Sequence, residues 1–431
     1  MNKKIIRPKK LRGTITPPGD KSISHRALMI NAIAGQTASI NGILESEDIQ
    51  STINCLRQLG VEIEMQKDGS CQVKGLGING LKATDHDLDC GNSGTTIRLL
   101  MGLIANIDGT ARLTGDNSLQ SRPMERVYSL LNAMGANIFS EKSNGCAPII
   151  VEGKQLTSNQ SIEMTIASAQ IKSALILAGL SSNGILEIIE PFKSRDHTER
   201  MLSAMGAKIN VHDNKVTVYG DTNELQSIDI DVPSDISSAA PWIVAGILHP
   251  DAEIVIKNVC INQTRSGIID VFVAMGAKIE IMNKRLVGNE EVADLGIYSS
   301  SLSGIQIDKE LIPRAIDEIP LIALGACFAN GNTKISNISE LKVKESNRLT
   351  NTIEIINQFG GEVFSCEDEL LINGLNSLHG AKLYCGSDHR MTMLAGIASL
   401  VSEEESELMN IDSVNVSYPN FWNDFEKLCV S

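Results

Sequence analysis

The phrase CLRQLGVEIEM, residues 55–65, joins an amphipathic helix to an alternating strand through a single glycine. Glycine just past an apolar run with helical spacing is the usual left-handed end of a helix, and the alternation of VEIEM is typical of a strand with one buried face. The phrase returns as LLNAMGANIFS (130–140), MLSAMGAKINV (201–211), VFVAMGAKIEI (271–281) and IINQFGGEVFS (355–365). The five glycines stand 70 to 84 residues apart, so the pattern predicts a repeated α/β unit.

A second recurring phrase is an apolar helix of small residues followed by a turn and a strand. Its six copies are HRALMINAIAGQTASINGI (25–43), TTIRLLMGLIANIDGTARLTG (95–115), QIKSALILAGLSSNGILEIIE (170–190), SAAPWIVAGILHPDAEIVIKN (238–258), IPLIALGACFANGNTKISN (319–337) and RMTMLAGIASLVSEEESELMN (390–410). Helices that are apolar nearly all round are buried. Six units of about 72 residues fit two lobes of three better than a solenoid, whose repeats are about 20–45 residues long. The alternative is generic α/β patterning without a true repeat.

The boundary between the lobes is visible in two similar turns. The segment TNELQSIDIDVPSD (222–235) is polar and turn-rich, and TPPGDKS (16–22) resembles DVPSDIS (231–237). Both combine proline with an Asp-centred turn ahead of a buried helix. We expect the chain to cross between lobes at these places, so that one lobe spans 20–231 and the other spans 1–19 together with 232–431.

The composition is that of an ordinary globular protein, with 42% hydrophobic and 21% charged residues. A formal charge of −14 and only 3% aromatic residues argue against a nucleic-acid partner, whereas a small acidic substrate needs only a local cluster of cations. No apolar run approaches the ~18 residues of a membrane span. The nine cysteines are widely scattered, which excludes a paired-cysteine zinc motif and suits reduced thiols. We expect a cytoplasmic protein without a metal.

Cations and hydroxyls gather where the predicted buried helices begin. PGDKSISHR (18–26) offers Lys21 and Arg26 beside Ser22, and the N-terminus of a helix is a natural phosphate site. A plain N-cap with solvated cations is the alternative for this stretch. CGNSGTTIR (90–98) supplies a glycine-bearing turn that lets an anion approach the backbone.

Two further stretches belong to the same predicted lobe. QSRPMER (120–126) contains Arg122, and SAQIKSA (168–174) opens the third buried helix. Lys172 lies inside that apolar helix. Burial of its ammonium group costs free energy unless the group meets an anion or a carboxylate.

The other lobe repeats the arrangement. AIDEIP (315–320) places Asp317 and Glu318 at a helix mouth, and SDHRMTM (387–393) does the same with Asp388, His389 and Arg390. KVKESNR (342–348) gathers Lys344, Glu345 and Arg348, for which a salt-bridged helix face is the alternative. Because the clusters occupy equivalent places in their repeats, we expect them to converge on one cleft for small anions.

Taken in order, these segments resemble the 5-enolpyruvylshikimate-3-phosphate synthase family. The likeness is carried by PGDKSISHRA, DCGNSGTTIRL, TGDNSLQSRPM, SAQIKSA, IDEIP, LKVKESNRL and SDHRMTM, and it spans residues 11 to 425. GDKS, SAQIK, RDHTE (195–199) and NQTR (262–265) further resemble its class II branch, often described as glyphosate-tolerant.

The resemblance implies an α/β fold of two lobes, each an inside-out α/β barrel of three βαβαββ units. It also implies transfer of the enolpyruvyl group of phosphoenolpyruvate to the 5-hydroxyl of shikimate 3-phosphate, with release of phosphate. This reaction of the chorismate route requires no metal or organic cofactor. The expected partners are the two small-molecule substrates, and the expected state is a monomer.

The resemblance assigns a role to each matching residue. Those expected to bind shikimate 3-phosphate are Lys21, Ser22, Arg26, Ser168, Ala169, Gln170, Ser194, Asp317 and Lys344. Those expected to bind phosphoenolpyruvate are Lys21, Gly94, Arg122, Gln170, Arg348 and Arg390. Asp317, Glu345 and Lys21 are the expected catalytic residues. Asp317 would accept the proton of the 5-hydroxyl, and Glu345 would handle the proton at the methylene carbon, because the chemistry deprotonates a hydroxyl while it protonates an alkene.

Some positions depart from the family pattern. Ala169, Glu340 and Val416 stand where many or some members have serine, asparagine and lysine. The nearest rival is UDP-N-acetylglucosamine enolpyruvyl transferase, which has Lys-Asn in place of Lys21-Ser22 and a loop cysteine that GDNSLQSRP lacks. A rival of another class is a non-catalytic repeat scaffold that binds polymers, which leaves the carboxylates at the helix mouths unexplained.

Overall fold

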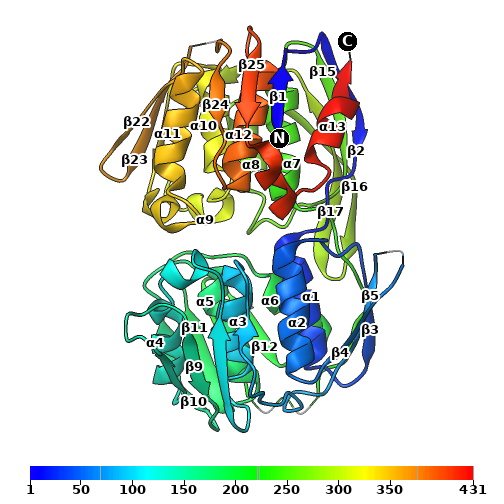
Figure 1. The fold of residues 1–431 in the computed structure, drawn as a ribbon, viewed down its shortest axis with the longest axis vertical. Coiled ribbons are helices and arrows are strands. Elements are labelled where there is room, and N and C mark those ends of the chain that lie inside the picture. Colours follow the sequence, from blue (N-terminus) through cyan, green and yellow to red (C-terminus); the bar gives the residue numbers. More distant parts are fainter. Residues whose placement is uncertain (68, 221, 223, 376, 431) are drawn as a thin grey trace. The chain divides into compact units, whose positions relative to one another are not determined.

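The computed structural model is a mixed α/β structure that describes residues 1–67, 69–220, 222, 224–375 and 377–430 (Figure 1). It divides into two compact units. Unit 1 comprises Met1–Pro18, Pro233–Arg285 and Glu291–Ser431, and unit 2 comprises Gly19–Val232 and Leu286–Glu290. Leu286–Glu290 therefore departs from the expectation that 232–431 lies in one lobe. Residue 223 of the expected crossover lies outside the described residues, and the division into lobes 20–231 and 1–19 with 232–431 stays a prediction.

Unit 2 alternates buried and amphipathic helices. These are α1 (Lys21–Ala32), α2 (Glu47–Gln58), α3 (Gly94–Leu103), α4 (Glu125–Ala133), α5 (Ala169–Leu180) and α6 (His197–Ala204), with a short 3₁₀ turn η1 (Leu119–Ser121). The helices α1, α3 and α5 are buried along nearly their whole length, because their sequences provide no polar face. Helix α3 packs against both α5 and α1, which brings the beginnings of these helices into one region of unit 2.

The strands of unit 2 form three four-stranded sheets with one repeated pairing pattern. Their orders are β14 (Ile230–Asp231)–β3 (Thr37–Asn41)–β5 (Cys71–Lys74)–β4 (Glu62–Met65), β6 (Leu88–Asp89)–β7 (Thr110–Thr114)–β9 (Ile149–Glu152)–β8 (Asn137–Ser140), and β10 (Thr157–Glu163)–β11 (Asn183–Ile189)–β13 (Lys215–Tyr219)–β12 (Ile209–His212). In each sheet the first pair is parallel and the next two pairs are antiparallel. A buried helix joins the parallel strands β6 to β7 and β10 to β11, as a parallel crossover requires.

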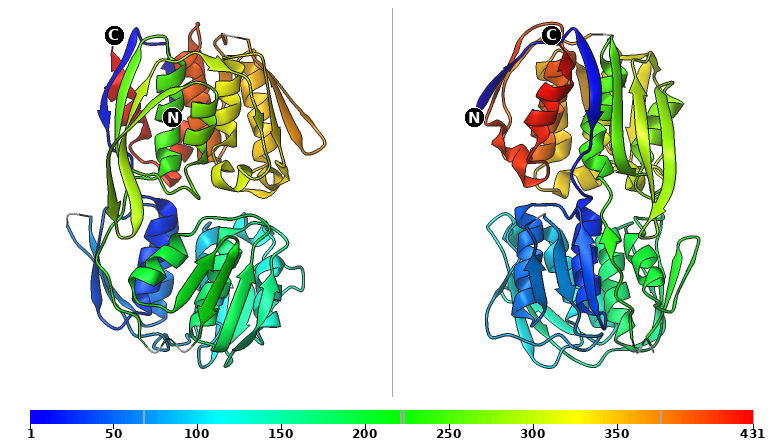
Figure 2. Two further views of the ribbon diagram at one scale, coloured as in Figure 1. Left: turned by 180° about the vertical axis from the view of Figure 1, so that it is seen from behind. Right: turned by 90° about the vertical axis from the view of Figure 1, so that its right-hand side faces the viewer.

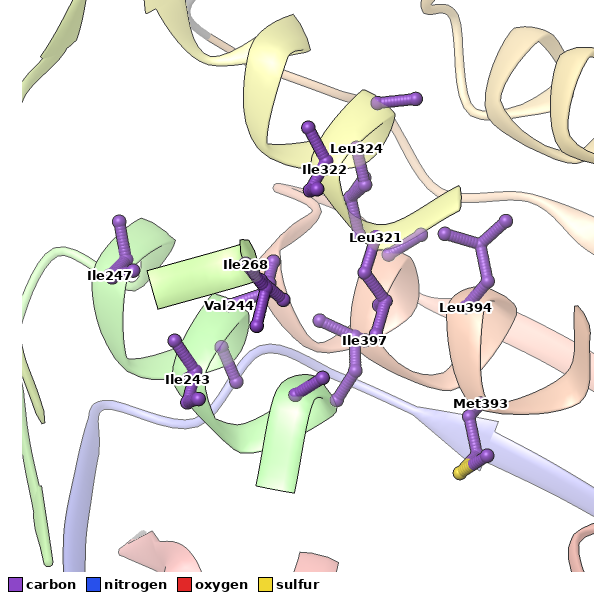
Figure 3. Close-up of a cluster of buried hydrophobic side chains, with 14 of the residues drawn as sticks. Ile243, Val244, Ile247, Ile268, Leu321, Ile322, Leu324, Met393, Leu394 and Ile397 are labelled. Atoms are coloured by element: carbon purple, nitrogen blue, oxygen red, sulfur yellow. The ribbon is translucent and has the colours of Figure 1, made fainter. Parts of the chain in front are cut away.

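Unit 1 contains the remaining helices. These are α7 (Ile236–Leu248), α8 (Gly267–Ala274), α9 (Ile312–Ala315), α10 (Ile319–Cys327), α11 (Arg348–Gln358), α12 (His389–Val401) and α13 (Phe421–Leu428), with the 3₁₀ turns η2 (Ser339–Val343) and η3 (Ile411–Val416). Figure 3 shows apolar side chains from α7, α8, α10 and α12 meeting in the core, among them Val244, Ile268, Leu321 and Ile397. The three remaining helices expected to be buried, α7, α10 and α12, are nearly inaccessible to water.

The sheets of unit 1 follow a related pattern. Their orders are β16 (Lys278–Val287)–β17 (Glu290–Tyr298)–β15 (Ala252–Cys260)–β2 (Lys10–Ile15)–β26 (Cys429–Val430), β19 (Gln306–Ile307)–β21 (Asn332–Ser336)–β23 (Glu369–Asn373)–β22 (Glu362–Cys366), β1 (Asn2–Ile5)–β25 (Ser406–Met409)–β24 (Lys382–Tyr384) and β18 (Leu302–Ser303)–β20 (Ala329–Asn330). Strand β19 pairs parallel with β21, which pairs antiparallel with β23, and β2, β15 and β17 repeat that sequence of pairings. Figures 1 and 2 show strands at the periphery of each unit, while amphipathic helices such as α2 and α13 also lie at the surface.

The five glycines of the recurring phrase confirm the predicted helix ends. Gly60, Gly135, Gly206, Gly276 and Gly360 have φ values of 97°, 94°, 85°, 99° and 83°. After α2, the amide of Gly60 donates to the carbonyl of Arg57 over 3.0 Å, and the amide of Val61 donates to that of Leu56 over 3.0 Å. The same pair of bonds follows α4, α6, α8 and α11. This is the Schellman arrangement, in which a left-handed residue satisfies the last carbonyls of a helix.

Among the described residues, no helix has the length and apolarity that a membrane crossing requires.

Candidate active site

The beginnings of the buried helices are fixed by side-chain caps. Asp20 accepts the amide of Ile23 over 2.9 Å at the start of α1, and Asp235 accepts the amide of Ser237 over 2.8 Å at the start of α7. These are the aspartates of the two similar turns predicted from the sequence. Ser93 caps α3 and Ser168 caps α5 in the same way. The caps therefore fix the N-terminus of each helix, where the remaining free amides point away from the helix.

Lys21 is the first residue of α1, and its Nζ forms a close ion pair with Asp48 of α2. The lysine side chain is 23% exposed and the aspartate 10%. The alternative considered for this stretch, a cation that is simply solvated, is therefore wrong for Lys21. Asp48 was missed by sequence reasoning because it lies in an ordinary amphipathic helix, where an acidic first turn is common.

Arg26 is buried, with 3% of its surface exposed, and its described partners are neutral. Its Nε donates to Thr198 Oγ1 over 2.7 Å, its Nη2 to Ser173 Oγ over 2.8 Å, and its Nη1 to the carbonyl of Ser22 over 3.0 Å. Burial lowers the pKa of Arg26 to about 10, against the opposing charge of Glu199. Among the described side chains, no carboxylate oxygen lies within ion-pairing distance of this guanidinium. A buried cation of this kind favours binding of an anion.

Gly94 begins α3 and lies beside two guanidinium groups. A Cβ at this position would stand 2.9 Å from Nη1 of Arg98 and 3.4 Å from Nη1 of Arg122. Arg122 is held by Asn92, whose Oδ1 accepts from Nη2 over 2.5 Å, and by Ser118 Oγ at 3.1 Å. A side chain at Gly94 would therefore crowd two guanidinium groups, whereas glycine lets an anion approach both the backbone and these cations.

Gln170, in the first turn of α5, is oriented by α3. Its Oε1 accepts from Arg98 Nη1 over 2.6 Å, and its Nε2 donates to Thr95 Oγ1 over 3.0 Å. The structure thus connects Gln170 to Gly94 and Arg122 through Arg98, which sequence reasoning did not single out. Ala169 and Ser168 precede Gln170 at the same helix start.

Ser194 lies beside a buried ion cluster. Lys172 Nζ stands 2.8 Å from Glu190 Oε2 and 2.7 Å from Glu199 Oε1, and these side chains are 1%, 1% and 3% exposed. Lys172 therefore meets carboxylates, one of the two outcomes that its burial predicts. Ser194 Oγ donates to Glu190 in a close hydrogen bond, and the carbonyl of Ser194 accepts from Lys172 over 3.2 Å. The cluster fixes the backbone and the hydroxyl of Ser194.

In unit 1, the expected site residues gather around one carboxylate. Asp317 Oδ1 lies 3.6 Å from Lys344 Nζ and 3.4 Å from Arg348 Nη1, and Oδ2 lies 3.8 Å from Arg390 Nη2. Three cations favour the ionised form of Asp317. Arg348 is 1% exposed and also binds Asp388, with Nε at 2.9 Å from Oδ2. Asp388 caps α12 and accepts the amide of Arg390 over 3.0 Å, so it ties the two arginines together.

Lys344 and Glu345 lie in the irregular segment between η2 and α11. The salt-bridged helix face considered for KVKESNR is therefore wrong, because the segment turns before α11 begins at Arg348. Glu345 Oε2 is 2.6 Å from Arg348 Nη2, and its side chain is 35% exposed. This partial exposure differs from the desolvated environment that a proton-holding carboxylate needs. Glu340 lies in η2, and Val416 is the half-buried last residue of η3.

Together, these geometries provide anion-binding elements in both units and a carboxylate surrounded by three cations in unit 1. In unit 2 the mouths of α1, α3 and α5 carry Lys21, Arg26 and Gln170, with Arg122 close to Gly94. In unit 1 Asp317 combines the features of a general base with three cations that can hold charged groups of a ligand.

The architecture is that of the enolpyruvyl transferases. The enolpyruvyl transferase NikO from Streptomyces tendae superposes with a TM-score of 0.79 at 16% identity, covering 99% of this chain and 96% of that one, which shows a common fold. The EPSP synthase of Acinetobacter baumannii superposes with a TM-score of 0.89 at 36% identity, over 100% and 99% of the two chains.

The chain belongs to the EPSP synthase (3-phosphoshikimate 1-carboxyvinyltransferase) family, whose model matches residues 5–425. A 3-phosphoshikimate 1-carboxyvinyltransferase of Thermoanaerobacter sp. (strain X514) is 46% identical over 99% of this chain and 100% of its own length. That of Roseiflexus sp. (strain RS-1) is 45% identical over 97% of each.

Proposed function

We propose that this protein transfers the enolpyruvyl group of phosphoenolpyruvate to the 5-hydroxyl of shikimate 3-phosphate and releases phosphate. Sequence similarity to 3-phosphoshikimate 1-carboxyvinyltransferases over nearly the full length of the chain supports this reaction. The observation that carries the mechanism is the Asp317 carboxylate, which lies within 3.8 Å of one lysine and two arginines. A base held among cations is suited to remove a proton while charged ligands are bound beside it.

The two ligands are assigned to the helix mouths. We assign shikimate 3-phosphate to Lys21, Ser22, Arg26, Ser168, Ala169, Gln170, Ser194, Asp317 and Lys344, and phosphoenolpyruvate to Lys21, Gly94, Arg122, Gln170, Arg348 and Arg390. The buried guanidinium of Arg26, with its neutral partners, supports an anion at the first group. The two guanidinium groups beside Gly94 support a phosphate in the second, because guanidinium binds phosphate and carboxylate in a bidentate fashion. Ala169 contributes only its backbone.

The reaction is an addition followed by an elimination. Asp317 takes the proton from the 5-hydroxyl as the hydroxyl oxygen bonds to the central carbon of phosphoenolpyruvate, and a proton is added to the methylene carbon, which becomes a methyl group. The methyl group then loses a proton while the bond between the central carbon and the phosphate oxygen breaks, which restores the double bond and releases phosphate. Glu345 moves the proton at carbon, and Lys21 supports the charge of the phosphate group. Glu345 would have to leave Arg348, its partner at 2.6 Å, in order to hold that proton.

The finer architecture belongs to the same proposal. The recurring pairing of strands and the six buried helices support two lobes of three βαβαββ units, each built as an inside-out α/β barrel. We further propose a cytoplasmic monomer that acts on small molecules rather than nucleic acid and needs no metal or organic cofactor.

A coupled phosphate-release assay tests the function directly. The protein is incubated with phosphoenolpyruvate and either shikimate 3-phosphate or UDP-N-acetylglucosamine. We expect release only with shikimate 3-phosphate, and strongly reduced release from a D317N variant. Release with UDP-N-acetylglucosamine alone would contradict the proposal and favour the sister enzyme. A wild-type protein that is folded but releases phosphate with neither acceptor would contradict both assignments.

A further inference from the structure

Glu318, next to the proposed base in the chain, has no role in the reaction proposed above, yet it is the most deeply buried carboxylate of this region. Its side chain is 0% exposed. A buried carboxylate is retained at a large desolvation cost, and it must be matched by cations and hydrogen bonds. Its neighbours therefore indicate what it does.

One side of Glu318 is occupied by a fixed counter-ion. Arg265 Nη1 donates to Glu318 Oε2 over 2.8 Å, and Arg265 is itself only 2% exposed. Ser237 Oγ makes close hydrogen bonds with both Glu318 Oε1 and Arg265 Nη2. The carboxylate of Asp235, which caps α7, lies 3.6 Å from Arg265 Nη2. Glu318 is thus locked in one orientation by Arg265 and Ser237, and Asp235 helps to hold Arg265.

The other side of Glu318 faces Arg390. Arg390 Nη1 lies 3.5 Å from Glu318 Oε1 and 3.4 Å from the main-chain carbonyl of Asp317. Its Nη2 lies 3.8 Å from the Asp317 carboxylate. Among the described residues, Glu318 and Asp317 are the two carboxylates within 4 Å of this guanidinium. Glu318 therefore attracts Arg390 in competition with Asp317, the proposed base. Without Glu318, Asp317 would be the one carboxylate partner of Arg390 among the described residues.

We infer that Glu318, locked by Arg265 and Ser237, is a positioning residue that holds Arg390 for phosphoenolpyruvate and keeps it from closing on Asp317. The inference rests on the proposed function, since it needs Arg390 to bind phosphoenolpyruvate and Asp317 to act as base. Without the charge of Glu318, Arg390 moves toward the remaining carboxylate. The arginine is then less available to the ligand, and the base becomes less basic because it gains a closer cation and loses a neighbouring anion.

The test is an E318Q variant, which keeps the shape of the side chain but removes its charge. We expect the KM for phosphoenolpyruvate to rise about 5- to 30-fold, less than the loss of a direct charged contact because Glu318 acts through Arg390, and that for shikimate 3-phosphate to change less than about threefold. The acidic limb of the kcat/KM profile should move to lower pH by about half a unit, because Asp317 loses its proton more readily. A purely structural role would lower the amount of active enzyme without moving that limb.

Three further variants support the interpretation. E318D keeps the charge and should restore most of the phosphoenolpyruvate affinity. S237A leaves every charge in place and should raise the KM for phosphoenolpyruvate by only about two- to fivefold. If E318Q folds poorly, the kinetics of S237A test the positioning role in its place. E290Q is the matched control, because Glu290 is also a buried carboxylate, 2.8 Å from His197 Nδ1 in unit 2. It should leave both KM values and the acidic limb unchanged.

The possible failures are distinguishable. If the wild-type protein releases no phosphate from its two substrates, the proposed function itself fails. If the wild type is active but folded E318Q and S237A keep its KM for phosphoenolpyruvate and its pH profile, the positioning role is overturned. An equal rise of both KM values would also overturn it, because the effect would not be specific to Arg390.

Discussion

Replacing Lys172 with methionine should destabilise the protein strongly, and more at high pH than at low pH. The substitution removes the ammonium group and leaves Glu190 and Glu199, which are 1% and 3% exposed, facing each other without their cation. Breaking a buried ion pair by removing one partner costs about 3–5 kcal/mol. The cost at this site should lie in that range near pH 8, because two carboxylates share the one lysine.

The pH dependence follows from Glu199. Burial raises the pKa of Glu199 above its ordinary value, although Lys172 opposes this effect. In K172M the opposition is lost, so the pKa of the folded variant rises further. A carboxyl group whose pKa is higher in the folded state than in the unfolded state favours folding at low pH, and this contribution is lost as the pH rises through the folded-state value. The deficit of K172M should therefore shrink by about 1–2 kcal/mol between pH 8 and pH 5.

Urea unfolding at both pH values measures the effect. The matched control is K334M, because Lys334 pairs with Glu369 at 2.7 Å while the two side chains are 41% and 34% exposed. Such a surface pair contributes about 0–1 kcal/mol. The double variant K172M/E199Q should recover part of the lost stability, since one buried charge is removed. A K172M deficit no larger than that of K334M, or one that grows toward pH 5, would refute the reasoning.

Other positions give simpler tests. G206A should lose about 1–2 kcal/mol of stability, because a left-handed Cβ residue is strained even where nothing crowds it; Gly206 has a φ of 85° and open space beside it, and G206N should lose less in the same urea titration. G94A should raise the KM for phosphoenolpyruvate about tenfold and that for shikimate 3-phosphate much less, because its Cβ would lie 2.9 Å from Arg98 and 3.4 Å from Arg122; steady-state kinetics showing equal changes would count against the assignment. Burial holds the pKa of His25 well below its ordinary value, so the wild type should lose up to about 1.4 kcal/mol more per pH unit than H25Q between pH 6 and pH 5, and parallel stability curves would show that His25 is not responsible.

The repeated parts of the fold could be predicted because their causes are local. A glycine after an apolar run ends a helix in one way, and a helix without a polar face must be buried. The strand that follows each glycine is given by its alternation. The turn Leu286–Glu290 could not be predicted, since its assignment to unit 2 depends on long-range contacts such as that of Glu290 with His197.

The cations and hydroxyls of the candidate site could be located from the sequence, because they gather where the buried helices begin; their roles stay a prediction. Their partners could not be located in this way. Asp48 beside Lys21 and Glu190 beside Ser194 lie in stretches without any distinguishing pattern. Arg265 had a motif, NQTR, but nothing in the sequence linked it to Glu318 or Ser237. Such pairings are set by packing between distant elements, which one sequence does not reveal.

A crystal structure of the D317N variant with shikimate 3-phosphate and phosphoenolpyruvate bound would test the assignment most directly. The helix-mouth proposal predicts the phosphate of shikimate 3-phosphate near the start of α5 and Ser194, and phosphoenolpyruvate within hydrogen-bonding distance of the guanidinium groups of Arg122 and Arg390. Either ligand bound away from these side chains would contradict it.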